Sequence, residues 1–187
     1  MTAKVVKILD VGRPQGQKMA ILSNESEPND SIDRYVTRLT CTGEEPFIVA
    51  PHWHKNHSEH FKVIEGRVEA TFDGKVALVQ AGDPQVCIPS RVIHSFKGFK
   101  GERLVIEERA DPSGIYKALF FNDLFGTGRP LGFWHALRAF YDGDGYVPLP
   151  FKLQIIDEVF ITVFGGIAKL FVAKRPETLG ETGVENK

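Results

Sequence analysis

Four of the chain's six histidines lie in one short stretch, PHWHKNHSEH at 51–60, together with Glu59. If this stretch begins at the end of a strand, His52 and His54 point to the same face, because strand side chains alternate. Glu59 can then return a carboxylate toward them after a short turn. Imidazole nitrogen and carboxylate oxygen are ligands that a divalent transition metal ion accepts together. The spacing therefore predicts a metal site at this point of the chain.

The other histidines differ in what their positions predict. His94, in PSRVIHSF, is the strand-like candidate for a fourth ligand. His57 lies in the predicted turn, and His60 points to the opposite face from Glu59, so we expect both to be solvent-exposed bystanders. His135 falls on a predicted helix, where it would have a structural role or belong to a lid.

These motifs carry a resemblance to the cupin superfamily. PHWHKNHSEHFKVIEG resembles the first cupin signature, H-x-H, three to five residues, Glu, six residues and Gly, through His52, His54, Glu59 and Gly66. GDPQVCIPSRVIHSFKG is similar in part to the second signature, through Gly82, Pro89 and His94. Arg91 stands where that signature usually has Gly, and Gly98 where it usually has Asn. The resemblance covers roughly residues 35–110.

The resemblance implies a fold, a ligand set and a cavity. Cupins are small antiparallel β-barrels of the jelly-roll type that hold a metal inside the barrel. The resemblance implies one divalent ion (Fe, Mn, Ni, Cu or Zn) bound by His52, His54, Glu59 and His94, with Glu59 also available as a general base. It also implies a cavity lined by Ile48, Ala50, Phe61, Val63 and Phe96. That lining is apolar, so we expect a small, fairly hydrophobic organic substrate.

The fold does not determine the reaction, and three functions remain open. The three-His, one-Glu set resembles that of cupin dioxygenases, which favours an oxidoreductase acting on an aromatic or enol substrate with O2. Alternatively, the metal acts only as a Lewis acid in isomerisation, cyclisation or decarboxylation. The third possibility is a non-catalytic ligand-binding cupin. Similar extended cupins among tailoring enzymes suggest a role in secondary metabolism.

The elements around the motifs predict a mainly β chain. Short runs rich in β-branched and aromatic residues recur up to about residue 110, and Asp73-Gly74 is typical of a two-residue hairpin turn. We expect residues 1–34 to supply strands that complete the barrel or a dimer interface, and 35–112 to form the antiparallel jelly-roll barrel. Residues 113–174 are predicted to be a C-terminal helical extension, and 175–187 a flexible tail.

The extension has two predicted helices. Pro130 can open the first, LGFWHALRAFY at 131–141. The second has an apolar stripe of period 3–4, formed by Leu153, Ile156, Phe160, Val163, Ile167 and Leu170. Gly165-Gly166 either bends this helix or lets another backbone come close. We expect the stripe to pack on the barrel or across a dimer. Alternatively, the extension forms an aromatic lid from Phe133, Trp134, Phe140 and Tyr141.

Composition limits the partners. The 187 residues carry a formal net charge of −1 and no Lys/Arg cluster, which excludes the electrostatics of nucleic-acid binding. The longest uncharged apolar run, VFITVFGGIA at 159–168, has ten residues, against roughly 20 for a membrane span. We therefore expect a cytoplasmic protein without membrane association. A small-molecule substrate and a homodimer are the expected partners.

Overall fold

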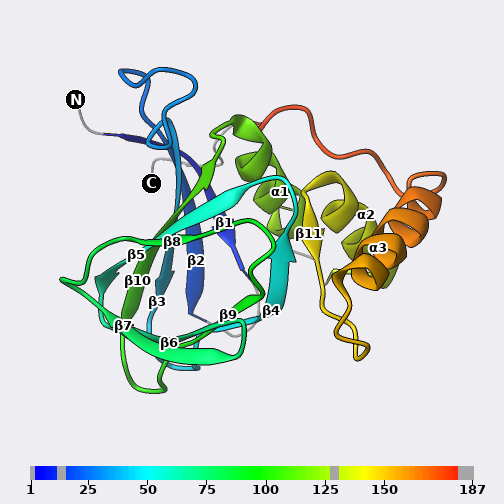
Figure 1. Cartoon of the computed structure of the whole chain (residues 1–187). Helices are drawn as coiled ribbons and strands as arrows, with labels where there is room; N and C mark the ends of the chain where they lie inside the picture. Colours follow the sequence, from blue (N-terminus) through cyan, green and yellow to red (C-terminus); the bar gives the residue numbers. More distant parts are fainter. Residues whose placement is uncertain (1–2, 12–15, 127–130, 181–187) are drawn as a thin grey trace.

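The computed structural model describes residues 3–11, 16–126 and 131–180, and within these ranges the chain is mainly β (Figure 1). One antiparallel sheet has the order β1-β2-β3-β10-β5-β8. Its strands are β1 (Lys4–Asp10), β2 (Gln17–Ser23), β3 (Tyr35–Cys41), β10 (Leu104–Asp111), β5 (Ser58–Glu65) and β8 (Val86–Ile88). The second sheet has the order β11-β4-β9-β6-β7. Its strands are β11 (Gly145–Tyr146), β4 (Ile48–His54), β9 (His94–Lys97), β6 (Arg67–Phe72) and β7 (Lys75–Gln80).

The two sheets stay separate, which corrects the expectation of a closed jelly-roll barrel. Among the described residues, no hydrogen-bonded ladder joins an edge strand of one sheet to an edge strand of the other. A barrel closes only where such edges pair. Two of the four edges, β8 and β11, have just three and two residues, too short to continue a ladder from sheet to sheet.

Strand alternation places the inner faces of the sheets. Along β5, Glu59, Phe61 and Val63 are buried while Lys62 and Ile64 are exposed. The ring of Phe61 stacks on Phe96 of the facing sheet, with ring centroids 4.3 Å apart. The core therefore lies between the sheets, and Glu59 shares its face.

The predicted hairpin is confirmed. Strands β6 and β7 pair antiparallel with Phe72 opposite Lys75, which leaves Asp73 and Gly74 as the two turn residues. Their φ angles are 47° and 80°, as the favoured two-residue hairpin turns require.

Three helices lie beside the sheets: α1 (Ile115–Phe125), α2 (Phe133–Asp142) and α3 (Gln154–Ala168). At Gly165, α3 comes close to α2, since a Cβ there would be 2.7 Å from the Leu137 carbonyl oxygen and 2.5 Å from Tyr141 Cβ. The second of the two roles predicted for the glycine pair, close approach of another backbone, is therefore confirmed for Gly165.

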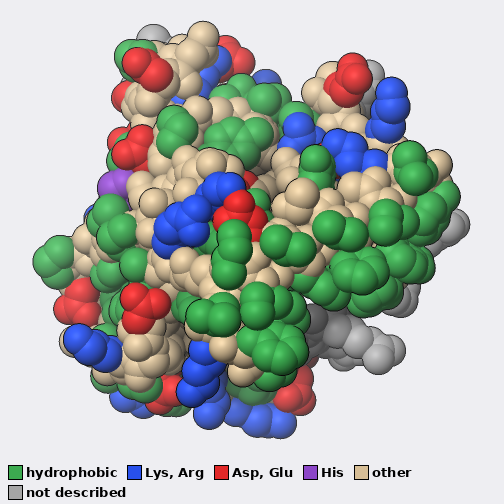
Figure 2. Space-filling model, turned by 45° about the vertical axis from the view of Figure 1, so that its right-hand side comes forward, with side chains coloured by type: hydrophobic (Ala, Val, Ile, Leu, Met, Phe, Trp, Pro, Cys, Tyr) green, Lys and Arg blue, Asp and Glu red, His purple; other side chains and the backbone are tan. Residues whose placement is uncertain are grey.

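The predicted apolar stripe of α3 is wrong, because a different face is buried. Asp157, Ile161, Gly165 and Ala168 point inward, whereas Val163 and Ile167 are 48% and 42% exposed. Asp157 determines the orientation: its carboxylate accepts hydrogen bonds from Trp53 Nε1 (3.1 Å) and from the backbone N–H of Leu149 (2.7 Å). Hydrophobic side chains consequently gather on the outer surface of the helical side of the molecule (Figure 2).

Parts of the predicted segments lie outside the described residues. These parts are residues 1–2 and 12–15 of the N-terminal segment, Pro130, and residues 181–187 of the predicted tail. In the part of the chain that the structure describes, β1 and β2 extend the first sheet beyond β3. None of the helices found there has the length and apolar character needed to cross a membrane.

Candidate metal centre

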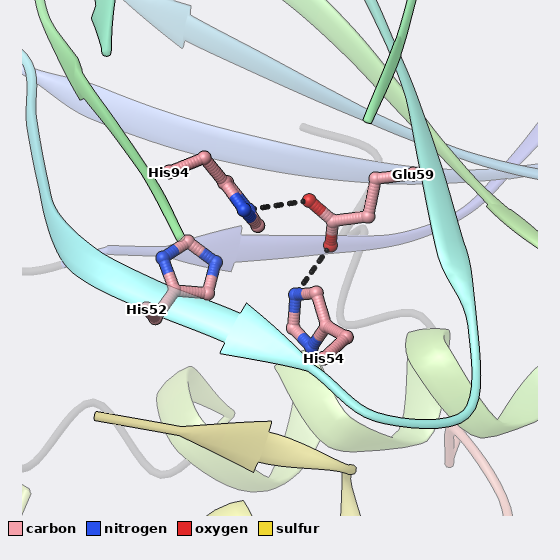
Figure 3. A group of neighbouring side chains, drawn as sticks. All are labelled: His52, His54, Glu59 and His94. Atoms are coloured by element: carbon pink, nitrogen blue, oxygen red, sulfur yellow. Dashed lines mark hydrogen bonds and ion pairs between the residues drawn. The ribbon is translucent and has the colours of Figure 1, made fainter. Parts of the chain in front are cut away.

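The structure brings the four predicted ligands together at one end of the space between the sheets (Figure 3). His52 and His54 come from the end of β4, Glu59 from the start of β5, and His94 from the start of β9. Their ligand atoms all lie within 4.8 Å of one another. His52 and His94 are direct cross-strand partners, and an irregularity in the β4–β9 ladder just before His52 brings them opposite each other.

Backbone carbonyls fix the tautomer of each imidazole. The Nδ1 atoms of His52, His54 and His94 lie 3.0, 2.8 and 2.9 Å from the carbonyl oxygens of Ala50, Asp144 and Val92. A carbonyl only accepts, so each Nδ1 carries a proton and donates it. In the neutral ring, Nε2 is then free to offer its lone pair, the arrangement by which outer hydrogen bonds orient metal-binding histidines; His52 and His54 are in this form.

The Nε2 atoms of His54 and His94 both lie beside the Glu59 carboxylate. His54 Nε2 lies 2.9 Å from Glu59 Oε1, and His94 Nε2 lies 3.1 Å from Glu59 Oε2. Because Nδ1 of His54 holds its proton, His54 Nε2 is buried without a hydrogen bond and faces another acceptor. The lone pairs of His54 Nε2 and Glu59 Oε1 therefore repel each other, and a divalent ion between the two atoms would turn both into ligands. The donor set therefore fits a transition metal ion.

The protonation states suit a metal ligand set. Burial, followed by the positive charge of His94, lowers the pKa of His52 to about 3. Burial and the neighbouring ammonium of Lys117 lower the pKa of His54 to about 4, so both imidazoles are neutral at neutral pH. For Glu59, burial favours the protonated acid, but the ammonium of Lys117 and the contacts with His54 and His57 together outweigh it and hold the pKa well below its usual range. Neutral imidazoles and an ionised carboxylate are the forms that bind metal.

His94 is the exception, because its pKa is raised. Burial lowers the pKa, but the hydrogen bond with Glu59, the charge of Glu59 and the hydrogen bond to the Val92 carbonyl together outweigh that effect. Because metal binding needs the lone pair of His94 Nε2, a metal ion would displace a proton held there.

An apolar cavity of about 330 Å³ ends at this group. His52, His54 and Glu59 border it, as do three of the five residues predicted to line it, Ile48, Ala50 and Phe96. The prediction is wrong for Phe61 and Val63, which are 1% and 2% exposed and belong to the core. They share the inner face of β5 with Glu59, but the sheets pack tightly there and Phe96 covers Phe61. The helical extension adds four rings to the apolar walls: Phe120, Phe121, Phe125 and Phe140.

Comparison with known protein families identifies the domain that contains this site. Residues 42–106 match the family model described as the cupin domain. The chain contains a cupin domain. The matched region of the cupin runs from the end of β3 into β10 and contains all four predicted ligands.

Several solved structures are similar to this cupin at low identity. KdgF from Halomonas sp. shares 18% identity, with 59% of this chain and 94% of that chain covered and a TM-score of 0.45. The polyketide cyclase RemF from Streptomyces resistomycificus shares 19%, with 59% and 79% covered and a TM-score of 0.44. An RmlC-like cupin from Shewanella frigidimarina NCIMB 400 shares 20%, with 60% and 96% covered and a TM-score of 0.41. No curated protein sequence matches the chain.

The helical extension of this cupin adds a buried cation that the motifs did not predict. Lys117 of α1 is 6% exposed, and its ammonium donates to Glu59 Oε1. Glu108 of β10 lies on its other side, with Oε1 3.3 Å from Lys117 Nζ. Burial disfavours the ammonium, but the two carboxylates outweigh it and raise the pKa of Lys117. The only sequence signal was a single cation within the apolar run IYKALFF.

His57 corrects the prediction of an exposed bystander, because it is 3% exposed. Its Nδ1 lies 2.9 Å from Asp144 Oδ2, and its ring stacks on His54 with centroids 4.1 Å apart. Burial lowers its pKa, but the interactions with Asp144 and Glu59 together outweigh this and the pKa is raised. With His54 and Asp144, His57 forms a second group whose ligand atoms are close enough for an ion. His60 is half-buried and faces Gln85, away from the four ligands.

The predicted aromatic lid is wrong for three of its four residues. Phe140 lines the cavity, but Phe133, Trp134 and Tyr141 do not border it. Phe133 is two helical turns before Phe140, about 10 Å along the axis, and packs against Trp134 instead. Tyr141 lies against α3 at Gly165.

His135 has a structural contact, as its helical position allowed. Its Nε2 lies 3.0 Å from Asp123 Oδ1, beside the buried ion pair between Asp123 and Arg138.

Proposed function

We propose that this cupin is a metal-dependent enzyme that acts on a small, fairly apolar organic molecule, through an oxygenase-type reaction on an aromatic or enol substrate. The observation that supports it best is the convergence of three imidazoles and one carboxylate at the end of an apolar cavity. A divalent ion would be held by His52, His54, Glu59 and His94. When bound, an Fe, Mn, Ni or Cu ion would supply the redox chemistry.

The chain's own residues would bind and orient the substrate. The rings of Phe96, Phe120 and Phe140 provide flat apolar walls against which an aromatic body can stack. The same walls exclude water from the end of the cavity, which strengthens every charge interaction there. The carbonyl of Asp144, by holding the proton on His54 Nδ1, keeps that ring turned toward the cavity end.

A second function, non-redox isomerisation, cyclisation or decarboxylation, is favoured by one specific observation. Lys117 and Glu108 form a buried acid–base pair directly beside Glu59, and burial followed by the charge of Glu59 raises the pKa of Glu108 to about 7. Groups with pKa values near neutrality suit proton transfer to or from a bound substrate. A metal such as zinc would then serve only to polarise a substrate oxygen. A non-catalytic ligand-binding cupin is the outcome if neither reaction is found.

Oxygen uptake tests the primary proposal. The purified chain, loaded in turn with Fe(II), Mn(II), Ni(II), Cu(II) and Zn(II), is mixed with catechols, flavonols and polyketide-like enols in an oxygen-electrode cell. The proposal expects uptake with at least one redox-active ion, none with Zn(II), and loss of uptake in His54→Ala but not in His60→Ala. Substrate conversion without uptake, and equally with Zn(II), would contradict the oxygenase and support the non-redox function.

A further inference from the structure

The outer side of α3 carries an uncovered apolar stripe. Ile155, Val159, Val163 and Ile167 follow one another at intervals of four residues, so they lie in one row along the helix. All four are exposed, from 63% at Ile155 to 42% at Ile167. Because the opposite side of α3 is buried, this row is the side that another surface can reach.

The stripe continues past the end of the helix. Leu170 and Phe171 are 83% and 59% exposed, and the ring of Phe171 packs edge-to-face against Trp134 of α2. We call these two side chains and the row of four the apolar face. Soluble proteins seldom expose a continuous apolar surface of this kind unless it contacts a protein or a membrane. Hydrophobic side chains gather on this side of the molecule, with Lys and Arg side chains along their upper edge in the view of Figure 2.

No carboxylate interrupts the apolar face. The acidic residues of α3 are Asp157, which is buried, and Glu158, which pairs with Lys55 and Arg91. The face can therefore enter an apolar environment without taking a negative charge with it.

A basic hollow of about 310 Å³ lies at the C-terminal end of the apolar face. Two of its lining residues, Lys169 and Val172, directly flank Leu170 and Phe171 in the chain. Its charged lining residues are Arg138, Asp142, Lys169, Lys174, Arg175 and Glu177.

The protein leaves part of this positive charge unpaired. Lys169 pairs with Asp142, and Arg138 pairs with Asp123. Lys174 and Arg175 form no ion pair with a carboxylate of the described residues, and Glu177 is the one unpaired carboxylate of the lining. Two cations against one carboxylate leave the hollow positive, which suits a phosphate group.

We propose that the apolar face docks on the surface of a membrane that contains anionic phospholipid, with a headgroup phosphate beside Lys174 and Arg175. Helices that lie in a membrane interface combine an apolar face with Lys and Arg in this way. The proposal goes beyond the proposed function. It also replaces the expectation of a protein without membrane association, which was drawn from a run too short to cross a bilayer.

Vesicle flotation of the full chain tests the apolar contact. The vesicles consist of phosphatidylcholine alone or of an equimolar mixture with phosphatidylglycerol. The variant Ile155→Ser with Val159→Ser should lower partition onto the mixed vesicles at least about tenfold. Its matched control is Val76→Ser with Leu78→Ser, on β7 at the opposite side of the molecule, where the two side chains are 64% and 52% exposed. The control should bind as the wild type does.

The same assay tests the charge contact. The wild type should prefer the mixed vesicles at least about fivefold, since each Lys or Arg near an anionic surface contributes about that factor. Lys174→Gln with Arg175→Gln should abolish this preference, and Lys174→Gln alone should reduce it if the double variant does not fold. The control Lys75→Gln with Lys97→Gln, at two exposed lysines, should retain it.

Several results would overturn the proposal. They are a wild type that floats with neither kind of vesicle or equally with both, a double variant at either contact that binds as the wild type does, and a control that loses binding. A second copy of the chain is the other possible occupant of the apolar face. A wild-type dimer that becomes monomeric in Ile155→Ser with Val159→Ser, together with no flotation, would show that occupant instead.

Discussion

Gly165 and Gly166 are neighbours on α3 that should respond oppositely to the same substitution. A methyl group at Gly165 would meet the Leu137 carbonyl oxygen at 2.7 Å and Tyr141 Cβ at 2.5 Å, whereas nothing lies within 4 Å of a methyl group at Gly166. Ala in place of Gly favours a helix by about 1 kcal/mol. Overpacking costs about 1–3 kcal/mol, toward the upper end where the obstacle is backbone that cannot rotate away.

The expected values follow from these two effects. Gly165→Ala should lower the free energy of unfolding by about 1–2 kcal/mol, and Gly166→Ala should raise it by about 0.5–1 kcal/mol. For a chain of this size, 1 kcal/mol shifts Tm by roughly 2–4 °C. Urea unfolding followed by circular dichroism measures both variants against the wild type. Equal stability of the two variants would refute the close packing of α2 and α3 at Gly165.

Three further predictions concern the ion pairs, the helix anchor and the oligomeric state. Asp157→Ala leaves the indole N–H of Trp53 and the backbone N–H of Leu149 without acceptors. It should lower the free energy of unfolding by about 2–4 kcal/mol. A change below about 0.5 kcal/mol in urea unfolding would show that these contacts do not orient α3. Burial raises the pKa of Glu107, but Arg38 and Arg109 together outweigh it and the pKa is lowered. The wild type should therefore lose stability relative to Glu107→Gln as pH falls below about 4.5, and parallel Tm curves from pH 7 to 3 would contradict this sign. The homodimer is expected in sedimentation velocity, and a monomer at every concentration would contradict it.

Local motifs predicted the parts of the site whose geometry is local. The H-x-H spacing of His52 and His54 and the short turn to Glu59 depend only on strand alternation, and the structure brings these residues together with His94. His57 was assigned wrongly because its partner, Asp144, lies 87 residues further along the chain. No local pattern contains that contact.

The extension was harder to predict because its helices are apolar on more than one face. The stripe of α3 has the right period, but burial of Asp157 by Trp53 turns a different face inward. Lys117 was missed for a related reason: a lone lysine in an apolar run is usually exposed, and only the tertiary fold places it beside Glu59 and Glu108. Sheet closure depended on the lengths of edge strands, which the sequence pattern does not determine.

Metal content tests the central claim most directly. The full chain is purified without a His-tag or chelator, and elemental analysis is applied to the wild type, His94→Ala and His60→Ala. His60 is a histidine of the same stretch that faces away from the four ligands, so it controls for nonspecific binding. We predict about one equivalent of a transition metal in the wild type and in His60→Ala, and its loss in His94→Ala. No metal in the wild type under any loading condition, or full retention in His94→Ala, would contradict the four-ligand centre.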